Sequence, residues 1–279
     1  MRRQFKEQPR LVKRVAVNVT GRDFVCGDIH GAYDLVLQAM REAQFSPTHD
    51  RLFVVGDLID RGPGSHRCAR FLAQPYVHAV RGNHEDMLLQ LYPEDSPPPP
   101  DSLLEWAARQ NGFGWWLATD GDTRRAIIEA VRRLPIAIEV QTSRGTVGIV
   151  HADIPLGLTW QSFLSLVESG NAKTIESALW SRERLNRRDE SGVHGVGRLF
   201  VGHTPQWEGL QRLGNVYAVD TGGVFAELDS DRWPGARFTF ANLAMATSSL
   251  TRLAPGAGLV DTRDGDVPDT PFGNYTTSR

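Results

Sequence analysis

The sequence predicts a mixed α/β (α+β) domain in which two β-sheets pack face to face and helices cover their outer surfaces. Short apolar runs that read as buried strands recur along the chain, and five of them end directly at a polar motif. Apolar residues with helical spacing lie between the first of these runs. More apolar runs follow residue 134 than a single doubly wound sheet needs, which favours two sheets over one.

The first half of the domain is expected to alternate strands with helices. Strands are expected at 24–26, 52–55 and 77–80. A helix that faces the core should follow the first strand, because apolar side chains recur there at helical spacing at Tyr33, Val36, Leu37 and Met40. A second such stripe predicts another helix, with Ile127, Ala130, Val131 and Leu134.

The segment between these two stripes is expected to form a cap beside the site. A helix is predicted at 84–92, and the four prolines at 97–100 should form an extended spacer after it. Residues 101–116 should then form a helical cap beside the cleft, in which the aromatic side chains serve packing; these are Trp106, Trp115 and Trp116.

The second half is expected to be rich in strands. They are predicted at 136–140, 146–150, 198–201, 216–219, 223–228 and 237–245. Residues 21–249 are then one catalytic domain, preceded by an N-terminal lead at 1–20. Residues 250–279 are expected to be a weakly ordered tail, because Gly, Pro, Thr and Asp interrupt every apolar run there.

Five loop motifs carry the chemistry. They read GDIHG (27–31), GDLIDRG (56–62), RGNHE (81–85), HAD (151–153) and GHT (202–204). Ligands of α/β sheets gather beyond the carboxyl ends of strands, so these loops are expected to converge on one crevice. Alone, Asp28 could merely cap a helix, Asn83 could form a turn, and His151 or His203 could be core histidines. Together the motifs predict a two-metal site, which activates water and attracts phosphate.

At these separations the motifs resemble the metallophosphoesterase superfamily, in particular the phosphoprotein phosphatase branch with its bacterial and bacteriophage serine/threonine phosphatases. The resemblance extends through NGFGWW (111–116), LPI (134–136), WSRER (180–184) and DTG (220–222), and covers roughly residues 20 to 230. It implies a metallophosphoesterase-type β-sandwich of two mixed sheets flanked by helices.

The resemblance also implies which residues bind metal. Asp28 and His30 would bind the first ion, and Asp57 would bridge both. The ligand set of the second ion would be completed by Asn83, His151 and His203. Oxygen and imidazole ligands without thiolate suit two divalent ions, with Mn²⁺ expected and Fe or Zn as alternatives. Two such ions would outweigh the two carboxylates, so an anionic substrate fits.

A metal-bridging hydroxide would attack phosphorus directly, without a covalent enzyme intermediate. By resemblance Arg61 and Arg182 would hold the phosphoryl oxygens, with Arg81 beside the site but less directly in contact. His84 would protonate the leaving alkoxide, and Asp60 would orient it. The simpler interpretations are surface ion pairs for the arginines and a helix-terminal position for His84.

Three functions are compatible with these residues. The first is hydrolysis of phosphoserine and phosphothreonine in proteins, or of small phosphoesters. The second is hydrolysis of symmetrical dinucleoside tetraphosphates, which the segment RGPGS (61–65) resembles, although Asp60 and Glu85 favour the phosphatase branch. The third is a non-catalytic phosphate-binding module, which nothing in the chain motivates because every predicted ligand is present.

Composition narrows the setting. The 279 residues are 41% hydrophobic and 23% charged, which allows a substantial core. A formal net charge of −2 and the lack of a long basic stripe predict no nucleic-acid partner. Two cysteines without metal-type spacing, no signal peptide and no long apolar run predict a cytoplasmic protein without a membrane partner. The oligomeric state stays open.

Overall fold

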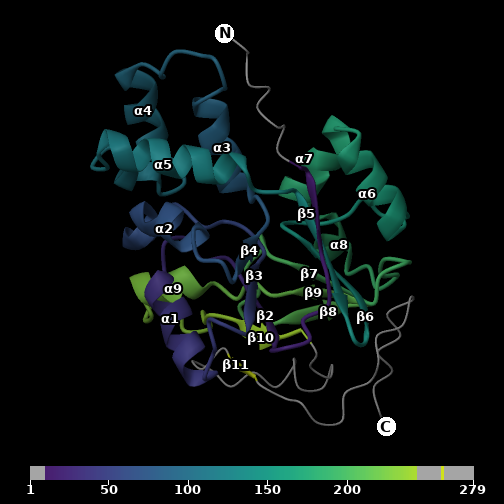
Figure 1. The fold of residues 1–279 in the computed structure, drawn as a ribbon. Coiled ribbons are helices and arrows are strands. Elements are labelled where there is room, and N and C mark those ends of the chain that lie inside the picture. Colours follow the sequence, from purple (N-terminus) through teal and green to yellow (C-terminus); the bar gives the residue numbers. More distant parts are fainter. Residues whose placement is uncertain (1–9, 244–258, 261–279) are drawn as a thin grey trace.

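Two β-sheets lie face to face in the computed structural model, which describes residues 10–243 and the backbone of residues 259–260 (Figure 1). Within these residues, one sheet has six strands and the other five. The six-stranded sheet consists of β1 (Val12–Val15), β5 (Ala137–Thr142), β6 (Gly145–Val150), β7 (Arg198–Val201), β9 (Val216–Ala218) and β8 (Gln211–Leu213), in that spatial order. The five-stranded sheet consists of β11 (Leu259–Val260), β10 (Phe240–Asn242), β2 (Asp23–Cys26), β3 (Arg51–Val54) and β4 (Val77–Ala79).

Both sheets are mixed, and their parallel portions determine where the loops emerge. Strands β2, β3 and β4 run parallel, whereas β10 is antiparallel to β2. In the other sheet β6, β7 and β9 run parallel, with antiparallel β5 and β8 beside β6 and β9. Because parallel strands end at the same edge of a sheet, the loops after β2, β3 and β4 emerge together, and so do those after β6, β7 and β9.

The core between the sheets is built by alternate side chains of each strand, as expected for a pleated backbone. Val25 and Phe53 point towards the opposite sheet, where they join Ile149, Phe200 and Tyr217 in one buried cluster. Their neighbours along β2 and β3 point the other way and pack beneath the helices. The sheets therefore share one interior layer and each carries a second, outer one.

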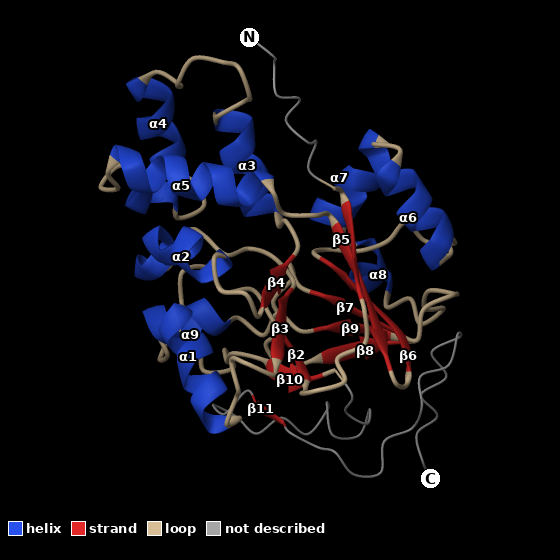
Figure 2. Cartoon of the chain, viewed as in Figure 1, coloured by secondary structure: helices blue, strands red, loops and turns tan. Residues whose placement is uncertain are grey.

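Helices cover both outer faces (Figure 2). The five-stranded sheet is flanked by α1 (Tyr33–Glu42), η1 (Pro63–Arg67), α2 (Cys68–Leu72), α3 (Asn83–Leu91), α4 (Asp101–Ala108), η2 (Phe113–Trp116), α5 (Gly121–Arg132) and α9 (Gly223–Leu228). The six-stranded sheet is flanked by α6 (Trp160–Glu168), α7 (Ala172–Trp180) and α8 (Glu183–Arg187). None of the helices in the described part of the chain has the length and apolar character required to cross a membrane.

The predicted fold class, a sandwich of two mixed sheets flanked by helices, is confirmed. The strand predicted at 223–228 is wrong, because this segment is helix α9. Gly222 adopts a left-handed conformation (φ 77°) and donates its N–H to Asp220, so the extended backbone ends there and a helix starts at Gly223. The apolar residues Val224 and Phe225 then fit a helical turn as well as a strand.

Three further segments form strands that the sequence did not predict. Residues 12–15, expected to precede the domain, form edge strand β1, with Val12 and Val15 buried. The polar strand β8 has no apolar alternation that could have predicted it. Residues 259–260 of the expected tail pair with β10, while the rest of that tail lies outside the described residues.

Candidate metal centre and active site

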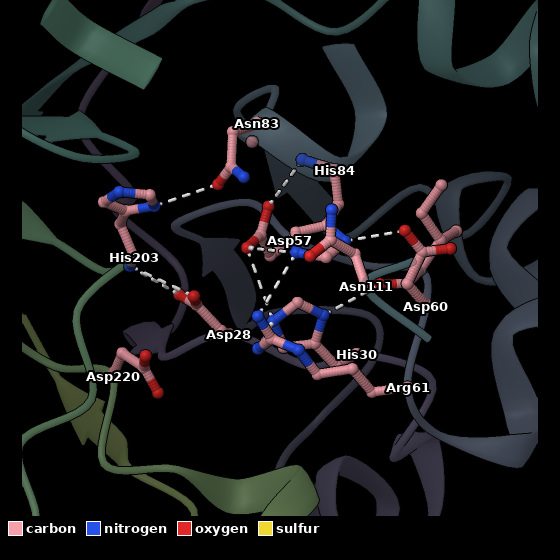
Figure 3. Close-up of polar contacts among 12 residues, drawn as sticks. Asp28, His30, Asp57, Asp60, Arg61, Asn83, His84, Asn111, His203 and Asp220 are labelled. Carbon is pink, nitrogen blue, oxygen red and sulfur yellow. Dashed lines mark hydrogen bonds and ion pairs between the residues drawn. The ribbon is translucent and has the colours of Figure 1, made fainter. Parts of the chain in front are cut away.

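Five loops, each of which follows a strand of one of the two sheets, bring polar side chains to one place (Figure 3). The loops follow β2, β3, β4, β6 and β7. They carry Asp28, His30, Asp57, Asp60, Asn83, His84, His151 and His203, all of which are buried. The convergence expected from the motif positions is therefore present in the structure.

Asp57 lies at the centre, and its two carboxylate oxygens face different histidines. Oδ2 is 3.3 Å from Nε2 of His30, whereas Oδ1 is 3.4 Å from Nε2 of His151. Two groups of potential metal ligands share this residue, and within each group the ligand atoms lie within 4.8 Å of one another. One group is His30, Asp57 and His84, and the other is Asp57, His151 and His203. Among the described residues, the predicted ligand Asp28 belongs to neither group, whereas His84, predicted as the acid, belongs to the first.

Asn83 belongs to the second group by its amide oxygen. This Oδ1 lies 2.8 Å from Nε2 of His151 and 2.9 Å from Nδ1 of His203. Asn83 is the first residue of α3, so the start of the helix fixes the direction of its side chain. An amide oxygen, two imidazole nitrogens and a carboxylate oxygen thus point at one space, which is a donor set suited to a divalent transition metal.

Two of the imidazoles are oriented by backbone carbonyls. Nδ1 of His30 lies 2.8 Å from the carbonyl oxygen of Ile59, and Nδ1 of His151 lies 2.8 Å from that of Val55. With the proton on Nδ1 donated to the carbonyl, each Nε2 presents its lone pair to the centre, as in metal-binding histidines. Burial lowers the pKa of both rings, so they are neutral as ligands must be.

Buried carboxylates crowd the other side of the centre. Asp28 accepts the backbone N–H of His203 at 3.0 Å, and Figure 3 shows it between His203 and Asp57. Burial, followed by repulsion from Asp220 and Asp57, raises the pKa of Asp28 well above its usual value. Burial likewise raises the pKa of Asp220 to about 6. Carboxylates held this close in a dry environment fit the binding of cations.

The site residues hold unusual backbone conformations. Five predicted site residues have positive φ without being glycine, namely His30, Asp57, Asp60, Arg61 and His203. Each such conformation costs on the order of 1–3 kcal/mol and is typical of functional sites. The neighbouring glycines are required sterically, because a Cβ on Gly82 or Gly202 would collide with a carboxylate oxygen of Asp57 or Asp28.

Glu85 clamps two of the loops together and was not predicted as a site residue. Its buried carboxylate accepts the N–H groups of Asp57 at 2.9 Å and Leu58 at 2.7 Å. It also accepts that of Gly82 at 2.8 Å and, at 3.3 Å, that of Ile59. Burial and the nearby Asp57 raise its pKa to about 7, although the backbone donors favour the charged form. Glu85 thereby fixes the distance between the loops after β3 and β4.

His84 is held by a chain of hydrogen bonds. Its Nδ1 lies 2.6 Å from Oδ2 of Asp60, and the other oxygen of Asp60 accepts the indole N–H of Trp115 at 2.7 Å. Burial alone would lower the pKa of His84, but Asp57 and the bond to Asp60 outweigh it and raise the pKa. The prediction that Trp115 serves packing is therefore incomplete, because its N–H orients the partner of His84.

The three predicted phosphate-binding arginines lie differently. The guanidinium of Arg61 donates to His30 and lies 3.3 Å from Nε2 of His84, with the ring of Phe225 5.4 Å from it. Nε of Arg182 donates to His203 at 3.2 Å. Arg61 and Arg182 thus adjoin the two donor groups.

Arg81 is paired with a carboxylate on α3. Its guanidinium lies 3.5 Å from the carboxylate of Asp86 on α3, which offsets part of its charge. Of the three arginines, it is the one whose charge is already paired with a carboxylate in the first turn of that helix.

Two other residues near the site were not predicted, and the sequence held a signal for one of them. Asp220 directly follows the run 216–219, as the predicted donors follow their strands, so the same rule could have identified it. The contact between Trp115 and Asp60 joins residues 55 positions apart, and no local pattern encodes it.

Residues 24–221 match the calcineurin-like phosphoesterase (Metallophos) family, well over half of the chain. The chain belongs to this family. It is therefore a metallophosphoesterase, and the predicted resemblance and hydrolase class are confirmed. Calcineurin-like phosphoesterases use divalent metals, and the two donor groups around Asp57 are the candidate ligands among the described residues.

Relatives of two kinds appear among the similar proteins. Serine/threonine-protein phosphatase 1 of Salmonella typhimurium is 38% identical over 207 residues, which cover 72% of this chain and 87% of that protein. A symmetrical bis(5'-nucleosyl)-tetraphosphatase of Yersinia enterocolitica is 35% identical over 102 residues, which cover 31% of this chain and 35% of that protein.

A solved structure shares the fold of this calcineurin-like phosphoesterase. The protein, named "putative diadenosine tetraphosphatase", superposes with a TM-score of 0.52 over 83% of this chain and 93% of that chain. The two sequences are 21% identical, so the likeness concerns the arrangement of sheets and helices.

Replacing Glu85 by Gln should destabilise the fold and loosen the metal loops. The amide cannot accept all of the backbone N–H groups, and charge-assisted bonds of this kind contribute roughly 1.5–3 kcal/mol each. We expect the free energy of unfolding, measured by urea denaturation, to fall by about 2–3 kcal/mol. The exposed helix residue Glu105 provides the control, since Glu105→Gln should change it by less than about 0.5 kcal/mol. Equal effects of the two substitutions would show that Glu85 is not a clamp.

Replacing Asp57 by Asn should abolish retention of two metal ions together, because it removes the carboxylate that both donor groups share. We expect elemental analysis to find about two ions per chain in the native protein and at most one in Asp57→Asn. Asp34→Asn, which changes an exposed carboxylate on α1, should keep the native content. Full metal content in Asp57→Asn would refute the shared ligand.

Proposed function

We propose that this calcineurin-like phosphoesterase is a metal-dependent phosphomonoesterase that hydrolyses phosphoserine and phosphothreonine residues of proteins. The observation that carries this proposal is the placement of His84, which lies close to His30 and Asp57 and is oriented by Asp60. The similarity to a serine/threonine phosphatase over 87% of that protein supports the same substrate class.

The metal assignment is part of the proposal. Asp28, His30 and Asp57 would hold one divalent ion, and Asp57 with Asn83, His151 and His203 would hold the other. The ions, with Mn²⁺ as the expected metal and Fe or Zn as alternatives, would activate water and neutralise charge on the phosphoryl group. The neutral, backbone-oriented rings of His30 and His151 and the crowded carboxylates support this assignment.

The arginines would bind the phosphoryl oxygens. Arg61 and Arg182 adjoin different donor groups, so a phosphoryl group over the centre could be held from two directions. A guanidinium offers a planar fork that matches phosphate geometry. Arg81 pairs with Asp86, so its predicted contribution to phosphate binding would be indirect.

His84 would donate a proton to the leaving oxygen. Its Nδ1 is occupied by Asp60, which leaves Nε2, on the side of Arg61 and Asp57, to face the substrate. The raised pKa of His84 keeps the ring protonated over a wider pH range. A general acid needs this combination of geometry and charge.

A dinucleoside tetraphosphate hydrolase is the second candidate. The identity of 35% to a symmetrical bis(5'-nucleosyl)-tetraphosphatase favours it, but it spans 31% of this chain. The similarity to the serine/threonine phosphatase spans 72% of this chain, and it therefore includes more of the residues around the site. We also place the protein in the cytoplasm, where the two buried free thiols Cys26 and Cys68 would remain reduced.

Replacing His84 by Asn should lower kcat by about 10²–10⁴ with little change in KM, because the interaction strengthens as the leaving group departs. Trp115→Phe, which removes one partner of Asp60, should lower kcat less. The exposed His66 offers a control, and His66→Asn should leave kcat unchanged. Native turnover in His84→Asn would remove this residue from the mechanism.

A comparison of substrates tests the proposed function directly. With Mn²⁺ supplied, kcat/KM should be higher for phosphoserine and phosphothreonine peptides than for diadenosine tetraphosphate. The phosphate released and the ADP formed are measured separately. A preference for diadenosine tetraphosphate would favour the second candidate, and hydrolysis of neither class would contradict both.

A further inference from the structure

A cavity of about 350 Å³ opens between α3 and α4, directly beside the candidate acid. His84 and Asp60 line part of it, together with Met87 and Leu91 of α3 and Trp106 of α4. His84 and Asp60 are each 2% exposed, whereas Trp106 is 61% exposed. The cavity therefore leads from the buried acid to an aromatic side chain at the surface.

The lining is apolar or neutral apart from His84 and Asp60. Among the described residues that line the cavity, none is Lys or Arg. Asn111 contributes an amide, which donates to Sδ of Met87 at 3.6 Å and lines the cavity together with Asp60. Methionine adapts its shape to different apolar groups, so this wall suits a variable side chain.

Trp106 does not belong to the buried face of α4. Leu104 and Ala107 are the residues of α4 that are buried, and Trp106 projects from the same helix to solvent. A large aromatic residue left exposed at the rim of a site is typical of a recognition surface. Because Trp106 lines the cavity, its side chain would contact a ligand that enters the cavity.

The position of the acid determines which part of a substrate meets this cavity. A general acid must lie within hydrogen-bond reach of the leaving oxygen, so the group attached to that oxygen starts at His84. The phosphoryl group itself would lie over the metal donors, on the side of Arg61 and Arg182. The leaving group is thus the part of the substrate closest to the cavity.

Dinucleoside tetraphosphates and phosphopeptides differ in the charge of their leaving groups. Symmetrical cleavage of a dinucleoside tetraphosphate releases nucleoside diphosphates, and a leaving group with that negative charge needs arginine or lysine partners. This cavity offers instead the carboxylate of Asp60 and an apolar wall. An uncharged leaving group with an apolar side chain gains from burial there.

We propose that the cavity between α3 and α4 receives an apolar side chain next to the phosphorylated residue of a peptide, with Trp106 and Met87 as specificity-determining residues. This inference rests on the proposed function, because it assumes that His84 protonates a serine or threonine oxygen. The occupant is an extended phosphopeptide segment with a large aliphatic or aromatic neighbour of the phosphoserine.

Three substrates test the proposal on the full-length, Mn²⁺-loaded protein. Two phosphoserine peptides differ only in the residues on both sides of the phosphoserine, which are Leu in one and Asp in the other. O-phosphoserine is the third, since its leaving group is too small to reach Trp106. We expect kcat/KM for the Leu peptide to exceed that for the Asp peptide by at least about tenfold.

Variants at Trp106 locate the effect. Trp106→Ala should remove most of the preference for the Leu peptide, chiefly through KM, while kcat/KM for O-phosphoserine stays native. Trp106→Arg should shift the preference towards the Asp peptide, and its activity on O-phosphoserine verifies its folding. Leu103 lies on the same helix but does not line the cavity, so Leu103→Ala should keep the native preference.

The outcomes are distinguishable. Equal kcat/KM for both peptides, or a preference that survives both Trp106 variants, would overturn the role of the cavity while leaving the proposed function intact. Hydrolysis of diadenosine tetraphosphate in preference to every phosphopeptide would overturn the proposed function and this inference with it.

Discussion

The arrangement of the site depends on the hydrogen bonds of one buried carboxylate. Glu85 accepts backbone N–H groups of Asp57, Leu58 and Gly82, and so ties the start of α3 to the loop after β3. Asp57, Asn83 and His84 all stand on these two segments. A displacement of about 1 Å at such a position can cost a hundredfold in rate, so the clamp matters for catalysis as well as for stability.

Electrostatics explains why the clamp must be strong. Asp28, Asp57 and Asp220 are buried close together, and burial, followed by repulsion from Asp220 and Asp57, raises the pKa of Asp28. Several site residues also hold costly left-handed conformations, including His30 and His203. The core between the two sheets offsets this strain in the folded protein. Bound cations would offset the repulsion and so couple metal binding to stability.

Local patterns in the sequence predict the strands and the donors that end them. Short apolar runs ending in polar motifs indicated the strands that carry the candidate donors, and the structure brings His30, Asp57, His151 and His203 together, with Asn83 next to the last two. The strand predicted at 223–228 was wrong because apolar residues at adjacent positions fit a strand or a helical turn equally well. The left-handed conformation of Gly222 favours the helix. The contact of Trp115 with Asp60, and the cavity beside His84, depend on how the cap packs across the sheet. No spacing within one segment encodes such long-range packing.

The site therefore combines a charged centre, held in place by hydrogen bonds, with a neighbouring cavity between α3 and α4 whose lining is mostly apolar or neutral. The central claim is that two metal ions lie on either side of Asp57. Anomalous diffraction from crystals grown with Mn²⁺ tests it most directly. Two peaks about 3.5–4 Å apart are predicted, one next to His30 and one next to Asn83, His151 and His203, with Asp57 in contact with both. A single peak, or two peaks of which one is out of contact with Asp57, would contradict the account.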